Sequence, residues 1–210
     1  GRSATARARA WIGMRLVAGK RGSGKTTELF RISASVCASS SSSTGLGDLD
    51  WDDGSRGDHG GGQEGGRVLF LCNRERLESD PPEHVVEAWQ ASRDDAFSGI
   101  QMRYVTDELD LKRVISCLHL IPPSKRPSSL VVDDIDLIMA TKASEEDENK
   151  NKILSLETRL ARCLAYLQNA STCLSRPASV VASITLGSEE DLQSNQMHIY
   201  RRYFASIQTM

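Results

Sequence analysis

The sequence lacks a long apolar run, and none of its hydrophobic stretches approaches the roughly 18 residues that a membrane-spanning helix requires. We therefore expect no contact with a membrane. The 210 residues, of which 39% are hydrophobic and 26% charged, suffice for one medium-sized domain with a hydrophobic core and a polar segment.

The sequence also lacks an excess of positive charge. It has 26 Lys and Arg residues against 28 Asp and Glu residues, which gives a formal net charge of -2. The basic footprint that nucleic-acid-binding domains usually carry is therefore absent from the chain as a whole. Any contact with DNA must come from a local patch or from a partner protein.

No two cysteines have the CxxC spacing of zinc sites and redox motifs. The five cysteines lie far apart and mostly in apolar stretches: Cys37, Cys72, Cys117, Cys163 and Cys173. An odd, scattered set of this kind predicts reduced thiols in a cytosolic or nuclear protein. It also argues against a metal site built from cysteines.

Two segments have compositions that predict disorder. Residues 1–10 contain three arginines and no acid, and they are open to three interpretations: a remnant of a transit peptide, a basic arm, or a segment left from cloning. Because the chain begins with Gly1, we expect its natural start to lie upstream.

Residues 39–66 are rich in Ser, then in Gly and Asp, so they cannot bury enough apolar surface to offset chain entropy. They predict a disordered insert inside a single domain of residues 11–210.

Apolar runs alternate with helical patterns along that domain. The runs predict strands at Trp11–Ala18, Val68–Cys72, Ile100–Val105, Leu130–Asp134, Val180–Leu186 and Tyr203–Met210. Helices are expected at Lys25–Ala38, Pro81–Arg93, Asp107–Leu120 and Glu145–Cys173. Asp80 is the expected N-cap of the second helix and Thr106 the expected cap of the third. The fourth helix has an apolar stripe formed by Ile153, Leu156, Leu160, Leu164 and Leu167. This alternation predicts an α/β fold with a mostly parallel sheet covered by helices on both faces.

The most informative motif is the segment 19–26, GKRGSGKT, which matches the phosphate-binding P-loop pattern. It follows an apolar strand and opens a helical pattern, which is the context that the motif requires. Its glycines allow backbone N–H groups to point at phosphate oxygens, and the helix that follows adds the positive end of its dipole. The motif predicts that Gly19, Gly22, Ser23, Gly24, Lys25, Thr26 and Thr27 bind a nucleoside triphosphate. Lys25 would contact the β- and γ-phosphates during catalysis, and the Thr26 hydroxyl would bind Mg²⁺.

A second half of the site is expected at Asp133, which follows the apolar run Ser129–Val132. A carboxylate at the carboxyl end of a strand beside the P-loop strand can hold Mg²⁺ through water. The alternative is that Asp133 or Asp134 only caps the next turn. Asp134 and Asp136 are weaker candidates for the metal.

Hydrolysis would also need a group that orients water. Glu75, just after the second predicted strand, is the candidate, although an exposed surface charge is the alternative. Ser183 and Thr185, at the end of the fifth predicted strand, could contact the γ-phosphate or could simply pack.

The order of these pieces resembles the RecA and recombinase-paralogue ATPases. The resemblance is carried by GKRGSGKTTELF, by VLFLCNRERLE, by residues 100–138 and by the tail YRRYFASIQ. More narrowly, the chain resembles the small ATPase subunits of Shu-type complexes, which pair with a SWIM-type zinc-finger protein. The resemblance covers residues 12–210 apart from the insert.

This resemblance implies a RecA-like core that binds ATP and Mg²⁺, with Gly19, Gly24, Lys25 and Thr26 on the phosphates and Asp133 on the metal. The family's catalytic glutamate would fall nearest Arg74, with Glu75 one position late, which implies a weak ATPase. The implied role is nuclear: a heterodimer with the SWIM protein that promotes recombinase filaments on single-stranded DNA during homologous recombination.

Direct contact with DNA has limited support in the sequence. The segment 187–197, where recombinases place a DNA-binding loop, is acidic, and phosphates would repel it. Arg201 and Arg202 follow it and either contact phosphate or form a solvated pair. We find no FxxA motif for docking a recombinase.

Three other functions are left open. A nucleotide or small-molecule kinase would need an acceptor pocket and an Arg-rich lid, and the only internal Arg cluster is Arg74 with Arg76. An AAA-type module would fit the Asp133–Asp134 pair, but the sequence shows no helical lid. A pure interaction subunit could carry a vestigial P-loop.

Overall fold

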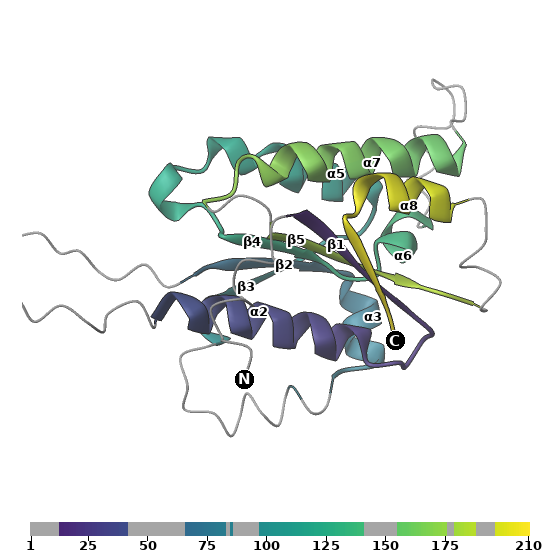
Figure 1. Cartoon of the computed structure of the whole chain (residues 1–210), viewed down its shortest axis with the longest axis horizontal. Coiled ribbons are helices and arrows are strands. Elements are labelled where there is room, and N and C mark those ends of the chain that lie inside the picture. The colour runs from purple at the N-terminus through teal and green to yellow at the C-terminus, as the bar shows by residue number, and fades with distance from the viewer. Residues whose placement is uncertain are drawn as a thin grey trace, which may run out of the picture.

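The computed structural model describes residues 13–41, 66–82, 85, 97–140, 155–175, 179–187 and 196–210. Six strands form one sheet in the order β3-β2-β4-β5-β1-β6, and every neighbouring pair is parallel (Figure 1). The predicted α/β class with a parallel sheet is thus confirmed. The strands are β1 (Gly13–Gly19), β2 (Val68–Cys72), β3 (Ile100–Tyr104), β4 (Ser129–Val132), β5 (Ser179–Thr185) and β6 (Ser206–Thr209).

The strand that precedes Asp133 does not lie beside the P-loop strand, so that expectation is wrong. β5 lies between β1 and β4 and pairs with both, with Gly19 opposite Thr185 and Val132 opposite Ala182. The carboxyl ends of parallel strands meet at one edge of the sheet. The P-loop, the end of β5 and Asp133 therefore come together although β5 separates the two outer strands.

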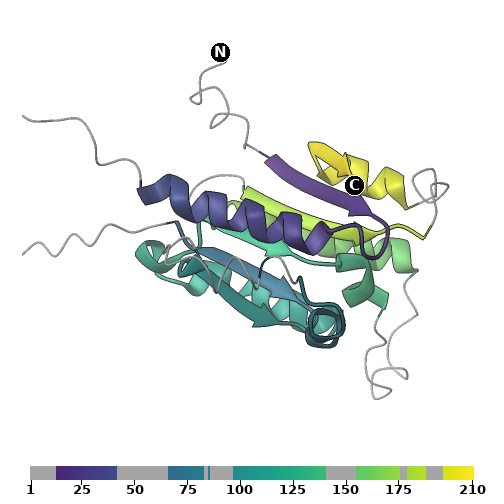
Figure 2. The same ribbon diagram turned by 90° about the horizontal axis from the view of Figure 1, so that it is seen from below.

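Helices cover both faces of the sheet, as predicted (Figure 1). One face carries α2 (Lys25–Ser41) and α3 (Arg74–Ser79). Figure 2, seen from that side, shows α2 running along the sheet. The opposite face carries α5 (Glu108–Ser116), α6 (Ile135–Ala140), α7 (Leu156–Ser171) and α8 (Met197–Tyr203).

The hydrophobic core lies in two layers because strand residues alternate between the two faces. Leu16 and Leu71 point toward the α5–α7 layer, whereas Val17 and Phe70 point toward α2. Phe30 of α2 stacks on Phe70 with ring centroids 4.4 Å apart. The central strand β4 is buried at all four positions, which explains its continuous apolar sequence.

Several predicted helix ends need correction. α2 continues to Ser41, three residues into the segment expected to be disordered; residues 42–65 of that segment lie outside the described residues. Thr106 does not cap α5, because the Asp107 carboxylate accepts the Asp110 N–H at 2.8 Å and fills that role. α7 begins after the cap Ser155.

The apolar stripe predicted on α7 is partly wrong. Leu156 is exposed, so the buried stripe begins at Leu160 and continues through Leu164 and Leu167. The predicted helical residues 145–154, including Ile153, lie outside the described residues.

Three short α-helices among the described residues were not predicted from the sequence: α3, α6 and α8. Because Tyr203 ends α8, the last strand begins at Ser206 rather than at Tyr203. Asp80 is the C-cap residue of α3, and of the helix predicted at 81–93 only residues 81, 82 and 85 are described. No described helix is long and apolar enough to cross a membrane.

Candidate nucleotide-binding site

The P-loop connects β1 to α2 and has the backbone that its sequence predicts. Gly22 and Gly24 have φ of 76° and 85°, a region that residues with a Cβ rarely adopt. A Cβ on Gly19 would collide with the Ser23 hydroxyl. That hydroxyl is buried and has no hydrogen-bond partner in the described residues. The loop thus offers backbone N–H groups and one unpaired buried hydroxyl at the amino end of α2, an arrangement suited to phosphate.

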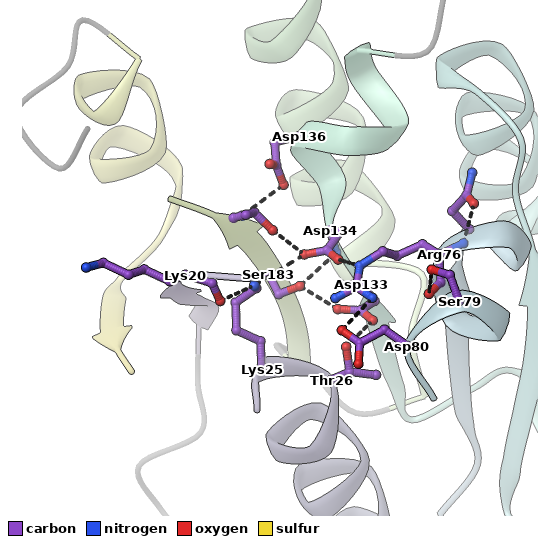
Figure 3. A network of polar contacts seen from close by, with 12 residues as sticks. Lys20, Lys25, Thr26, Arg76, Ser79, Asp80, Asp133, Asp134, Asp136 and Ser183 are labelled. Carbon is purple, nitrogen blue, oxygen red and sulfur yellow. Dashed lines mark hydrogen bonds and ion pairs between the residues drawn. The ribbon is translucent and has the colours of Figure 1, made fainter. Parts of the chain in front are cut away.

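Lys25 is the first residue of α2 and is almost fully buried, with 3% of its side chain exposed. Its Nζ donates to the Lys20 carbonyl oxygen at 3.1 Å and lies 3.7 Å from Asp134 Oδ1 (Figure 3). Its charge is therefore held at the P-loop rather than in solvent.

Asp133 follows directly after β4 and is only 3% exposed. In the described part of the chain, the hydrogen bonds that its carboxylate accepts come from hydroxyl groups (Figure 3). Thr26 Oγ1 donates to Oδ2 at 2.8 Å, and Ser183 Oγ donates to Oδ1 at 2.6 Å. The Thr26 bond joins the two motifs that the sequence predicted would bind Mg²⁺, 107 residues apart. With its hydrogen engaged by Asp133, the Thr26 oxygen keeps its lone pairs for a cation.

Asp134 has a different environment from its neighbour. Its backbone adopts φ 48°, an uncommon conformation for a residue with a side chain, and only 2% of the residue is exposed. Its N–H donates to Ser183 Oγ at 2.7 Å, and its Oδ1 accepts from Thr185 Oγ1 at 2.9 Å. Its two oxygens also lie next to two cations, Lys25 and Arg76.

Arg76 reaches the same network from α3. Its Nε lies 3.2 Å from Asp134 Oδ2, and its Nη1 donates to Asp80 Oδ2 at 2.9 Å. α3 begins at Arg74 because Asn73 Oδ1 accepts the Arg76 N–H and caps the helix.

A cleft of about 520 Å³ opens between the P-loop and the end of α3. Both segments contribute to its walls: Gly22, Gly24, Lys25, Thr26, Thr27, Arg76, Ser79, Asp80, Pro81 and Pro82. The cleft is large enough for a small ligand. Of the predicted phosphate-binding residues, Gly22, Gly24, Lys25, Thr26 and Thr27 line it.

Burial changes the pKa of two carboxyl groups at this edge. It raises the pKa of Asp133, and the adjacent charge of Asp134 raises it further, against the hydroxyl bonds and Lys25, which lower it. Burial likewise raises the pKa of Asp136 to about 6, although its Oδ1 accepts the Thr185 N–H at 3.1 Å. A buried carboxyl group with hydroxyl partners and a raised pKa is one that a nearby divalent cation would stabilise in its ionised form.

The donor set at Asp133 fits Mg²⁺ with a polyphosphate. Mg²⁺ prefers oxygen ligands and is usually bound by one or two carboxylates together with phosphates and water. Asp133 and Thr26 would supply the protein oxygens. No group of three metal-binding side chains occurs among the described residues.

The structure does not place Glu75 in this cleft. Its side chain is exposed in the first turn of α3 and is not among the cleft-lining residues, so its catalytic role stays a prediction. Arg74, at the position expected for the glutamate, pairs with Glu78 at 2.7 Å and lies over the Tyr104 ring. Of Arg74, Glu75 and Arg76, the one that lines the cleft is Arg76, a position that the sequence did not predict.

The candidate DNA-contacting residues lie elsewhere. Arg201 and Arg202 are exposed in the last turn of α8, and residues 188–195 of the predicted DNA-binding loop lie outside the described residues. Ser183 and Thr185 do not line the cleft; they bond to Asp133 and Asp134 and fix the two carboxylates.

No protein-family model matches this chain, and a search of curated proteins found none that matches it. The interpretation of the site therefore depends on its own geometry.

Proposed function

We propose that this protein is a RecA-like subunit that binds ATP with Mg²⁺ in the cleft between the P-loop and α3. The observation that carries the proposal is the 2.8 Å bond from Thr26 to Asp133, which joins the P-loop to a buried carboxylate at the end of β4. When bound, Mg²⁺ would neutralise phosphate charge. Thr26 and Asp133 would hold it, and Lys25 would contact the phosphates.

The strand order supports the RecA-like part of the proposal. One strand, β5, lies between the P-loop strand and the strand that precedes Asp133, as in the strand-inserted P-loop ATPases to which RecA-like proteins belong. The sequence resemblance extends this to the small ATPase subunits of Shu-type complexes. The biological role that follows is nuclear: pairing with a SWIM-type zinc-finger protein and promoting recombinase filaments on single-stranded DNA.

Slow hydrolysis is part of the proposal. Glu75 is exposed outside the cleft, and the one carboxylate among the described cleft-lining residues, Asp80, is paired with Arg76 at 2.9 Å. We therefore infer that no described carboxylate of the cleft wall is free of a cation to serve as the base, which favours slow turnover. Bound ATP would then serve assembly of the complex more than turnover.

Calorimetric titration of the full chain with ATP and Mg²⁺ tests the binding site. Lys25→Ala should weaken binding by about 100-fold, or about 2.7 kcal/mol, because it removes a charge-assisted contact to phosphate. Arg31→Ala is the matched control, since Arg31 is an exposed cation of the same helix that pairs with Glu28. Equal affinity of the wild type, Lys25→Ala and Arg31→Ala for ATP would contradict the proposed site.

Co-purification tests the proposed complex. The tagged full chain should retain a SWIM-type zinc-finger protein from cells, and Lys25→Ala should retain less of it. If no such protein is retained, the Shu-type assignment is wrong, while nucleotide binding stands or falls on the titration.

A further inference from the structure

Arg76 is the one cation in the described part of the cleft wall that does not belong to the P-loop. α3 carries it to the cleft with only 14% of its side chain exposed, whereas Arg74 on the same helix is 67% exposed and lies outside. The chain thus buries a second positive charge opposite the loop that binds phosphate in the proposed function.

Arg76 and Lys25 share one carboxylate. Lys25 Nζ is 3.7 Å from Asp134 Oδ1, and Arg76 Nε is 3.2 Å from Asp134 Oδ2 (Figure 3). Asp134 is itself fixed by Ser183 and Thr185 in a backbone conformation that costs energy and persists only where the surroundings enforce it. The shared anion therefore holds both cations at defined positions, Lys25 on the P-loop and Arg76 on α3.

The position of Asp134 indicates which phosphate Arg76 would meet. Asp134 follows Asp133, the proposed Mg²⁺ residue, and in P-loop enzymes the metal bridges the β- and γ-phosphates. Arg76 thus lies on the metal side of the site, where the terminal phosphate would lie. The described contacts engage its Nε and Nη1, which leaves the N–H groups of Nη2 as donors.

We propose that Arg76 is a second phosphate-binding cation, supplied by α3 of the same chain, which contacts the terminal phosphate and makes the site prefer a nucleoside triphosphate to a diphosphate. This inference rests on the proposed function. A guanidinium suits the role because its planar fork matches two phosphate oxygens. The alternative is an ion pair that only attaches α3 to the sheet.

Competition binding to the full chain with Mg²⁺ separates these roles. Affinities for ATP and ADP are measured in the wild type, in Arg76→Ala and in the matched control Arg74→Ala. Arg76→Ala should weaken ATP binding by about tenfold, or about 1.4 kcal/mol, and leave ADP binding within about twofold. Arg74→Ala should leave both affinities unchanged.

Three outcomes overturn the inference. If Arg76→Ala changes neither affinity, or weakens ATP and ADP equally, Arg76 does not contact the terminal phosphate, and the proposed function is unaffected. If the wild type binds neither nucleotide, the proposed function and the inference fail together.

A second variant covers the possibility that Arg76→Ala does not fold, which a thermal melt would show. Arg76→Lys keeps the charge but loses the planar fork. It should lose part of the preference for ATP while ADP binding stays the same. An unchanged preference, or an equal loss for both nucleotides, would overturn the inference.

Discussion

At the carboxyl edge of the sheet, beside the residues that line the cleft, two buried carboxylates have different partners, and we call the two groups the hydroxyl half and the cationic half. In the hydroxyl half, Asp133 accepts hydrogen bonds from Thr26 and Ser183. In the cationic half, Asp134 lies between Lys25 and Arg76. The two acids are adjacent in sequence and equally buried, yet one has neutral partners and the other has charged partners.

The difference assigns separate tasks to the two halves. The charge of Asp134 is already balanced inside the protein, so this residue is suited to positioning cations. Among the described residues no side chain forms an ion pair with Asp133, and burial raises its pKa, so this residue is suited to an external cation such as Mg²⁺. The same sequence pair, Asp133–Asp134, thus serves two purposes because each carboxylate points to different neighbours.

The largest expected effect is on stability, and it should differ between substitutions of Asp134 and Asp133. Asp134→Asn should lower the free energy of unfolding by about 3 kcal/mol, because it removes the anion that buried Lys25 and partly buried Arg76 share. Asparagine tolerates the positive φ, so the backbone is a small part of the loss. Asp133→Asn should cost only about 1 kcal/mol, because its partners are uncharged hydroxyls. Urea unfolding at pH 7.5 without nucleotide measures both, and equal losses would contradict the comparison.

Ser183 joins the two halves, because it donates to Asp133 and accepts the Asp134 N–H. Ser183→Ala should lower the free energy of unfolding by about 2 kcal/mol, since it leaves buried polar groups without partners. The matched control is Ser33→Ala, a buried serine whose hydroxyl donates to the Leu29 carbonyl within α2, and it should cost less. If the two variants lose the same stability in urea, Ser183 does not join the two carboxylates.

Mg²⁺ should distinguish the two acids by function. Asp133→Asn should weaken binding of ATP in the presence of Mg²⁺ by about tenfold, or about 1.4 kcal/mol, and leave metal-free binding unchanged. Asp134→Asn should keep the Mg²⁺ response, because it removes no proposed metal ligand. Titrations with Mg²⁺ and with a chelator measure the response. A response lost in Asp134→Asn and kept in Asp133→Asn would reverse the assignment.

The smallest expected effect is the dependence of stability on pH. The pKa of Asp136 is raised to about 6, so between pH 4 and pH 6 the folded state binds more protons than the unfolded state. The contribution of this group to stability is fully present below pH 4 and is lost as the pH rises toward 6. The free energy of unfolding should therefore fall by about 1 kcal/mol over this range, after allowance for partial exposure of Asp136. The raised pKa of Asp133 acts in the same direction. Asp136→Asn should flatten the decline in urea unfolding, and an unchanged slope would contradict the role of Asp136.

The parts of the fold that depend on local patterns could be predicted from the sequence. Apolar runs located the strands, and the two motifs named from the sequence, the P-loop and Asp133, are joined in the structure by the hydrogen bond from Thr26. The insertion of β5 between β1 and β4 could not be predicted, because strand order depends on which pairs pack best rather than on order in the chain.

Within the cationic half, the position of Arg76 was missed for a local reason. In the segment 74–80, RERLESD, charges of both signs alternate, and the sequence alone does not say which side chain faces the cleft. The Asn73 cap was a usable signal, because it begins α3 and so fixes the rotation that turns Arg76 inward and leaves Arg74 and Glu75 exposed. No comparable signal in the sequence predicts the positive φ of Asp134.

The central claim is that the cleft binds ATP through Mg²⁺ at the hydroxyl half. The most direct measurement is the affinity of the wild-type chain for ATP at pH 7.5, with Mg²⁺ and then with a chelator in its place. We predict saturable binding that weakens by about tenfold when Mg²⁺ is removed. Absence of saturable binding, or an affinity that does not respond to Mg²⁺, would contradict the account.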